Sequence, residues 1–339
     1  MQPASFYKTR ENRSVQCLLC PHLCILNPDQ YGKCNTRVNR KGELITESYG
    51  ILSAISTDPI EKKPLYHFFP GSSILSIGSF GCNLSCNFCQ NCDISQIDPH
   101  ILSRHPSRDP NDIVNKALLH RDNIGLAYTY NEPTIYYEYM LRCAALIKEQ
   151  QQYNVMVTNG YINRAPLDAI LPYMDAFNVD LKSFRNDFYH KQSGATLKPV
   201  LDTISKISRS DRHLELTFLI IPDLNDSVSE WADMINWISE NCGADTILHV
   251  SRYFPRYKLN KPPTPLQTLQ DFLELAREKI RYVYAGNTPQ LESHTLCPGC
   301  GTMLIRRNLY HASVIGIGAD GHCSQCHMEI NGIFNETVS

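Results

Sequence analysis

The sequence predicts an α/β protein whose centre is a partial (β/α)6 barrel of the TIM type, with a cysteine-rich module on each side of it. Two observations carry this prediction. Short apolar patterns typical of strands alternate with amphipathic patterns typical of helices between residues 73 and 285, and this alternation indicates parallel strands joined by crossover helices. Apart from Cys143 and Cys242, the 14 cysteines fall into three tight groups.

The composition narrows the class of protein. A chain of 339 residues is long enough for one large domain with small additions. The net charge of −2 provides no basic surface for nucleic acid. The chain has no apolar run long enough for a transmembrane helix, and its polar first residues do not resemble a signal peptide. We therefore expect a cytoplasmic protein whose cysteines bind metals rather than form disulfides.

The first cysteine group predicts a small metal-binding β module. It contains Cys17, Cys20, Cys24 and Cys34, with His22 among them. Four thiolates suit one tetrahedral zinc ion, with His22 as a substitute ligand, whereas the C-x2-C-x3-C spacing also suits an auxiliary iron–sulfur cluster. Strand patterns at 36–38 and 43–49 flank a turn and predict a β-hairpin. We assign residues 1–69 to this module and a connector.

The connector, Asp58–Gly71, combines turn residues with charges and aromatics. One interpretation is a solvated linker packed on the barrel. The other is a strap over the active site that offers Lys62, Lys63 and His67 to a substrate.

Residues 70–290 are predicted to form the barrel. The expected strands are 73–78, 124–129, 154–158, 176–181, 214–220, 246–250 and 281–285. The expected helices begin near Asp109-Pro110 and at Pro133, and lie at 165–174, 198–209, 227–241 and 265–280.

Three cysteines with the spacing C-x3-C-x2-C follow the first predicted strand: Cys82, Cys86 and Cys89. Iron prefers soft thiolate ligands, and three of them leave one iron of a [4Fe–4S] cube open for chemistry. With Phe88 before the last cysteine, the spacing resembles the signature of the radical S-adenosylmethionine (SAM) superfamily. That resemblance implies a cluster whose open iron is chelated by the amino and carboxylate groups of SAM. A zinc loop is the alternative, although zinc sites usually come as two separated pairs.

Cys92 offers a rival interpretation of this loop. Cys86, Cys89 and Cys92 also follow the opening of a bacterial ferredoxin run, C-x2-C-x2-C. That run needs a further cysteine at position 96, where this chain has Gln96. We therefore treat Cys92 as a bystander.

Polar residues stand at the carboxyl ends of the next strands, where α/β barrels place their chemistry. Superfamily members commonly have Gly-Gly-Glu-Pro after the second strand, and here only Glu132-Pro133 matches. The resemblance implies that Glu132 binds the ammonium of SAM; alternatively, Glu132 stabilises a helix N-terminus. Asp180 and Lys182 share one strand face, and they either contact SAM or form a buried ion pair. Further candidates for substrate contact are His249, Ser251, Arg252 and Tyr253.

The last unit, residues 291–339, holds two C-x2-C knuckles. Their cysteines are Cys297, Cys300, Cys323 and Cys326. Two such pairs separated by about a hairpin indicate a structural zinc ribbon or a rubredoxin-like iron site. A module this small depends on its metal for stability.

Taken together, the motifs resemble the radical SAM enzyme of the AmmeMemoRadiSam system, which is related to pyruvate formate-lyase activating enzymes. The resemblance rests on the motifs at 17–24, 58–65, 81–91, 129–134 and 180–182. It implies that Cys82, Cys86 and Cys89 bind the cube. It also implies that the SAM site is lined by Glu132, Asn159, Asp180 and Lys182.

The resemblance also implies an activity. A one-electron donor of the flavodoxin or ferredoxin type would reduce the cluster, and reductive cleavage of SAM would yield a 5′-deoxyadenosyl radical that abstracts hydrogen from a substrate. That substrate is either a glycine of a partner protein, which needs an open barrel mouth, or a small molecule or peptide. A cap of the N-terminal module over the mouth would favour the second, and a Memo-family protein is a candidate partner. The alternative from another class is an iron–sulfur electron carrier with structural zinc modules and no SAM chemistry.

Overall fold

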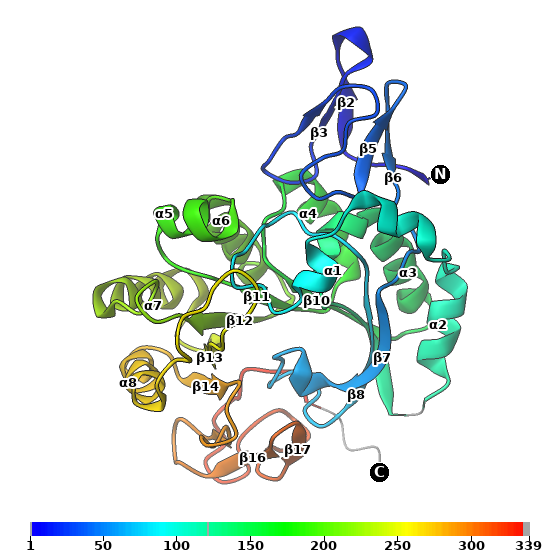
Figure 1. Cartoon of the computed structure of the whole chain (residues 1–339). Coiled ribbons are helices and arrows are strands. Elements are labelled where there is room, and N and C mark those ends of the chain that lie inside the picture. Colours follow the sequence, from blue (N-terminus) through cyan, green and yellow to red (C-terminus); the bar gives the residue numbers. More distant parts are fainter. Residues whose placement is uncertain (1, 121, 335–339) are drawn as a thin grey trace.

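An eight-stranded sheet forms the centre of the computed structural model, which describes residues 2–120 and 122–334 (Figure 1). In sheet order its strands are β14 (Tyr282–Gly286), β13 (Ile247–Arg252), β12 (His213–Ile220), β11 (Ala176–Asp180), β10 (Tyr153–Thr158), β9 (Asn123–Tyr128), β8 (Ser73–Gly78) and β7 (Ala54–Pro59). Strands β8 to β14 run parallel, while β7 pairs with β8 antiparallel. Among the described residues β7 and β14 are the sheet edges, so the barrel is partial. The predicted fold class is confirmed.

The longer helices cover the outside of the sheet (Figure 1). The helices are α1 (Cys92–Ser95), α2 (Pro110–Leu118), α3 (Tyr137–Glu149), α4 (Arg164–Ile170), α5 (Asn186–Phe188), α6 (Leu197–Ser208), α7 (Val228–Cys242) and α8 (Leu266–Arg277), and the short α1 borders the cavity through Ser95. Short 3-10 turns are η1 (Glu11–Arg13), η2 (Ile60–Lys62), η3 (Pro99–Arg104), η4 (Pro133–Tyr136) and η5 (Leu171–Tyr173), and η6 (Tyr189–Ser193) is a π-helix. Helix α2 begins as predicted, because Asp109 accepts from the Asn111 amide and Pro110 occupies the first turn.

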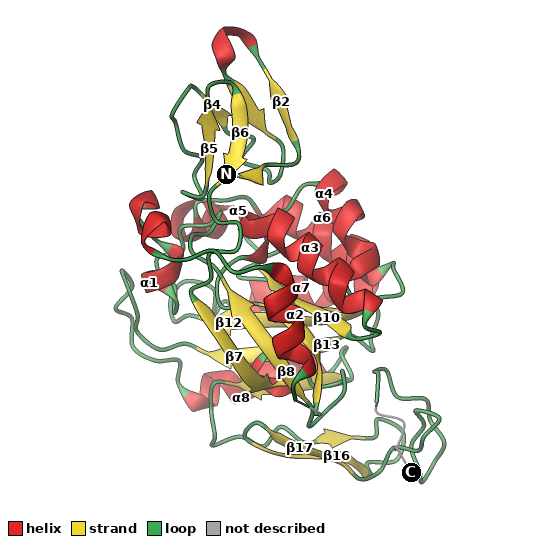
Figure 2. Cartoon of the chain, turned by 90° about the vertical axis from the view of Figure 1, so that its right-hand side faces the viewer, coloured by secondary structure: helices red, strands yellow, loops and turns green. Residues whose placement is uncertain are grey.

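The N-terminal module consists of two small sheets. One contains β1 (Gln2–Pro3), β6 (Glu43–Thr46) and β5 (Arg37–Arg40), and the other β2 (Tyr7–Thr9), β3 (Val15–Cys17) and β4 (Ile25–Leu26). The predicted hairpin is therefore present as β5 and β6. The C-terminal module is a sheet of β15 (Thr295–Leu296), β16 (Met303–Asn308) and β17 (His311–Val314). The two modules lie on opposite sides of the barrel (Figures 1 and 2).

The module boundaries at 69/70 and 290/291 stay predictions. Strand β7 joins the barrel sheet although it lies within the range 1–69. Residues 1 and 335–339 of the predicted modules lie outside the described residues. No helix in the described part of the chain is both long and apolar enough to cross a membrane.

The connector matches neither of its predicted forms in full. Leu65 and Phe68 are fully buried, so the segment is not a solvated linker. His67 is also fully buried: its Nδ1 lies 2.6 Å from the Asn331 carbonyl oxygen and its Nε2 2.6 Å from the Tyr284 hydroxyl. The prediction that His67 is available to a substrate is therefore wrong. Apolar neighbours on both sides of this histidine drive the segment into the barrel interior.

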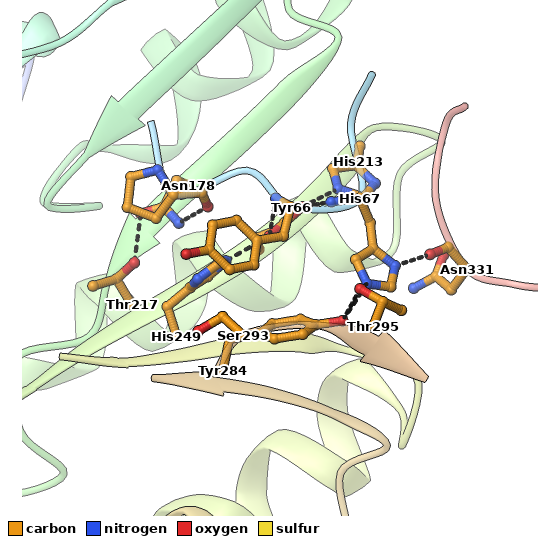
Figure 3. A network of polar contacts seen from close by, with 12 residues as sticks. Tyr66, His67, Asn178, His213, Thr217, His249, Tyr284, Ser293, Thr295 and Asn331 are labelled. Carbon is orange, nitrogen blue, oxygen red and sulfur yellow. Dashed lines mark hydrogen bonds and ion pairs between the residues drawn. The ribbon is translucent and has the colours of Figure 1, made fainter. Parts of the chain in front are cut away.

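A buried carboxylate anchors the connector there. Glu215 lies in the amino-terminal half of β12 and accepts from the backbone amides of Tyr66 at 2.9 Å and His67 at 2.7 Å. The same carboxylate contacts His213 Nε2 at 2.8 Å and His249 Nε2 at 2.6 Å. Figure 3 shows Tyr66 and His67 of the connector close to His213 of β12, His249 of β13 and Tyr284 of β14. Since each carboxylate oxygen has partners, the charge is held without contact to water.

Candidate active site

A cavity of about 530 Å³ opens at the carboxyl ends of the parallel strands. The residues predicted to hold the cluster and SAM all line it: Cys82, Cys86, Cys89, Glu132, Asn159, Asp180 and Lys182. Its rim carries the exposed residues Gln90, Asn91 and Asn287. The topology explains this meeting, because parallel strands bring residues from distant parts of the sequence to one edge of the sheet.

The three-cysteine loop follows β8 and is held by backbone contacts. The Ser85 amide donates to the Ser193 carbonyl at 3.0 Å and the Asn87 amide to the Gln192 carbonyl at 2.9 Å, so the loop pairs with η6. Cys86 is buried, whereas Cys82 and Cys89 are partly exposed to the cavity. Cys92, the first residue of α1, is not among the residues that line the cavity.

Glu132 has the helix-terminus role that the sequence offered as the alternative to SAM binding, and it also lines the cavity. Its Oε1 accepts from the Thr134 amide at 3.0 Å and the Thr158 hydroxyl at 2.8 Å, which caps η4. Its Oε2 accepts from the Asn159 amide at 2.8 Å. Burial raises the pKa of Glu132, and the hydrogen bonds from Asn159 and Thr134 act against that rise. The helix-terminus role is confirmed, and the carboxylate also lines the cavity.

Asp180 and Lys182 form an ion pair on the cavity wall. Lys182 Nζ lies 3.0 Å from Asp180 Oδ2, with the Asp180 side chain 39% exposed. Burial opposes the charge of Lys182, but the Asp180 carboxylate outweighs it, so the pKa of Lys182 is raised. Because the pair faces the cavity rather than a packed interior, its remaining oxygen lone pairs are open to a ligand.

Among the further candidates, only Ser251 lines the cavity. His249 contacts Glu215, Arg252 Nε donates to the Thr264 carbonyl at 2.7 Å, and the Tyr253 hydroxyl donates to the Leu259 carbonyl at 2.7 Å. The polar atoms of these three side chains therefore make contacts within the fold, and the side chains do not line the cavity.

The model of the Radical SAM superfamily matches residues 76–238, which include the cysteine loop and most of the strand ends around the cavity. The chain contains a radical SAM domain. Such a domain implies radical chemistry that uses a [4Fe–4S] cluster and SAM. The three cysteine sulfurs fit such a cluster, since they face one cavity but are not within 4.8 Å of one another as the ligand atoms of a single ion would be.

Relatives of this radical SAM protein include uncharacterized protein MJ0808 of Methanocaldococcus jannaschii. It is 40% identical over 337 residues, which cover 98% of this chain and 99% of that protein. The 4-hydroxyphenylacetate decarboxylase activating enzyme of Clostridioides difficile is 23% identical over 123 residues, or 36% of this chain and 39% of the enzyme. A solved domain of pyruvate-formate lyase-activating enzyme from Bacteroides vulgatus has a TM-score of 0.43 at 13% identity, covering 48% of this chain and 98% of that domain.

Asn83 is a site residue for which the sequence suggested no role. Its Oδ1 accepts from Asn159 Nδ2 at 2.8 Å, and its Nδ2 donates to the Tyr161 carbonyl at 2.8 Å. Its own carbonyl lies 2.7 Å from His22 Nε2. Asn83 therefore ties the cysteine loop both to the end of β10 and to the N-terminal module. Its place between Cys82 and Cys86 was the one signal available in the sequence.

Asp58, Lys63 and Tyr130 form a second group of interacting cavity residues that the sequence did not bring together. Lys63 Nζ is 2.7 Å from Asp58 Oδ2, and the Tyr130 hydroxyl donates to the same oxygen at 2.5 Å. Lys63 also stands 4.7 Å from the centre of the Tyr130 ring. Tyr130 has a positive φ of 69°. Together with Lys62, these residues line the cavity, as the connector interpretation predicted for the two lysines.

The C-terminal cysteines form a compact cluster that could hold one metal ion. All four sulfurs lie within 4.8 Å of one another, with 3.5 Å between Cys297 and Cys326 and 3.7 Å between Cys300 and Cys323. Four sulfurs bound at about 2.3 Å to one tetrahedral ion lie about 3.8 Å apart. The site therefore has the dimensions of a single metal ion.

Gly81 is needed where the cysteine loop meets the N-terminal module. Its φ is +93°, and an added Cβ would lie 2.5 Å from the Cys34 carbonyl oxygen. We expect Gly81→Ala to lower the free energy of unfolding and the iron content. Gly243→Ala is the matched control, because Gly243 has the same φ and nothing within 4 Å of an added Cβ. The control reports the backbone strain alone, about 1–3 kcal/mol, and equal losses in both variants would contradict the contact with Cys34.

Proposed function

We propose that this protein is a radical SAM enzyme whose cluster is held by Cys82, Cys86 and Cys89. The observation that supports it is the single cavity onto which these three cysteines and the polar strand ends face. When bound, the reduced cluster and SAM supply a 5′-deoxyadenosyl radical through one-electron cleavage of the C5′–S bond, and this radical abstracts hydrogen from the substrate. Electrons would come from a flavodoxin or ferredoxin.

The chain's own residues would bind and orient SAM. Glu132 and Asn159 belong to one hydrogen-bonded unit next to Cys82, and this unit suits the ammonium end of SAM. Asp180 would accept from the ribose hydroxyls, while Lys182 would hold the carboxylate. The apolar side chains of Leu84, Phe88 and Leu181 complete this part of the wall and exclude water from the reacting atoms.

We propose that the substrate is a polypeptide segment, with a glycine of a partner protein as the first candidate. No described residue before Asp58 lines the cavity, so the cap of the N-terminal module that would favour a small substrate is not supported. The partner would be a glycyl radical protein or, if the AmmeMemoRadiSam assignment holds, a member of the Memo family. The test is deuterium transfer into 5′-deoxyadenosine from candidate proteins labelled at glycine. Transfer from a labelled small molecule but from no protein would refute this choice.

For the C-terminal module we propose one structural zinc ion, bound by Cys297, Cys300, Cys323 and Cys326. The short distances between their sulfurs support a single ion. Such an ion holds together a unit whose own apolar core is small.

Asp180→Asn tests the SAM site separately from the cluster. Removing the carboxylate charge should weaken SAM binding about tenfold, as expected for the loss of a charge-assisted hydrogen bond. Iron content should not change. The control is Asp202→Asn, because Asp202 also pairs with a lysine, Lys198, but lies on an exposed helix face. Equilibrium binding of SAM to the reconstituted proteins measures both, and unchanged affinity in Asp180→Asn would exclude Asp180 from the site.

A further inference from the structure

The four N-terminal cysteines meet around one buried cavity of their own. Cys17, Cys20, Cys24 and Cys34 all line it, together with apolar side chains such as Leu19, Leu26 and Ile135. Four thiols gathered in an apolar pocket of a chain without disulfides indicate a metal site. The sequence left two occupants open, because the C-x2-C-x3-C spacing suits both zinc and an iron–sulfur cluster.

The distances between the cysteine sulfurs distinguish a zinc ion from an iron–sulfur cluster. Within residues 2–120 and 122–334, the C-terminal cysteines are the one set of three or more such ligand atoms that lie within 4.8 Å of one another. The N-terminal sulfurs are thus too far apart for one zinc ion, whose four sulfurs would lie about 3.8 Å apart. The sulfurs of Cys82, Cys86 and Cys89 likewise do not all lie within 4.8 Å of one another. A cube needs sulfurs that are farther apart than those around one ion, since each of its cysteines binds a different iron.

His22 is not the substitute ligand that the sequence allowed. Its Nε2 faces the Asn83 carbonyl at 2.7 Å, so the ring is used to join the module to the cysteine loop. The cysteine sulfurs have polar partners instead: the Thr36 hydroxyl donates to Cys34 Sγ at 3.2 Å, and Arg37 reaches Cys17 Sγ at 4.0 Å. The Arg37 side chain is only 1% exposed and pairs with Glu138. Its guanidinium is therefore shared between the Glu138 carboxylate and the Cys17 sulfur.

We propose that the N-terminal module binds an auxiliary [4Fe–4S] cluster through Cys17, Cys20, Cys24 and Cys34. Four cysteine ligands leave no iron open, so this cluster would carry electrons and would not bind SAM. The proposal does not depend on the function proposed for the main cavity.

The auxiliary site adjoins the active site. Asn83 lines the N-terminal cavity, while its neighbours Cys82 and Leu84 line the main cavity. Gly81 packs against the Cys34 carbonyl on the other side of the loop. A second electron-carrying centre would therefore stand next to the loop that holds the first.

Metal analysis of the anaerobically purified, iron-reconstituted full chain tests the proposal. We expect about eight irons and eight sulfides per chain, for two cubes, and about one zinc. The double variant Cys20→Ser, Cys24→Ser should lose about four irons and no zinc. The control variant Cys242→Ser removes a cysteine outside the three groups and should lose neither metal. A wild-type chain that contains about four irons, enough for one cube, together with about two zinc ions would overturn the proposal.

A complementary variant keeps the test valid if that double variant fails to fold. Replacing Cys82, Cys86 and Cys89 by Ala leaves the N-terminal site intact. This variant should retain one cube, visible by Mössbauer spectroscopy, whose electron paramagnetic resonance signal in the reduced state does not change on addition of SAM. A variant free of iron would overturn the auxiliary cluster. Failure of the proposed function would look different: the wild-type signal itself would not respond to SAM.

Discussion

Cys86→Ala should abolish the formation of 5′-deoxyadenosine from SAM under dithionite, lowering the rate more than about a thousandfold. Cys86 is the buried member of the three-cysteine loop, and its sulfur faces the main cavity. Without this ligand the cube loses one of its three protein attachments, and the whole reaction depends on the cofactor that the cube holds. Quantifying 5′-deoxyadenosine in anaerobic, reconstituted protein measures the effect.

The matched control is Cys92→Ala. Cys92 is only three residues after Cys89, but it lies at the start of α1 and does not line the cavity. This variant should retain the wild-type rate. If Cys86→Ala keeps full turnover, or if Cys92→Ala loses it, the assignment of Cys82, Cys86 and Cys89 as the cluster ligands is refuted.

Glu215→Ala should have the largest effect on stability, lowering the free energy of unfolding by about 3–5 kcal/mol. The carboxylate is fully buried and is shared by two backbone amides and two histidines (Figure 3). Its loss would leave all four donors without a partner and release the connector from β12. Glu292→Ala is the control, because Glu292 also approaches a histidine but is 85% exposed. Chemical denaturation should give the control a free energy of unfolding close to that of the wild type.

The Glu215 network also predicts a pH dependence. Burial alone would raise the pKa of Glu215, but the hydrogen bonds from His213 and His249 outweigh it and hold that pKa well below its usual range. The folded-state pKa is thus depressed. The stabilisation is present above the ordinary glutamate pKa of about 4.3 and is lost as pH falls through the folded value. The difference in unfolding free energy between wild type and Glu215→Gln should shrink below about pH 4; a constant difference would contradict a buried anion.

The barrel could be predicted in detail because most of its strands are buried on both faces. Strand β8 has the predicted bounds, and the others differ by one or two residues. The edge strand β7 was missed, since Ala54–Pro59 contains polar residues and a proline, which are typical of turns and also tolerated at sheet edges. The connector was misjudged for a related reason: its charges suggested exposure, although its aromatic residues are buried.

The active site was predictable where one motif or strand end carries the signal. The cysteine loop, Glu132 and the pair Asp180 and Lys182 all line the cavity as expected. Contacts between residues distant in sequence could not be predicted, such as Asn83 with His22, because spacing along the chain does not reveal which loops meet. The sequence left the occupant of the N-terminal cysteines open, since the same cysteine spacing suits both zinc and iron.

An anaerobic crystal structure of the reconstituted protein with SAM, recorded at the iron absorption edge, tests the central claim most directly. We expect a cube in the main cavity with three irons bound to Cys82, Cys86 and Cys89, and the fourth bound to the amino and carboxylate groups of SAM. A fourth iron bound to Cys92 or to another side chain, or a main cavity free of iron, would contradict the account.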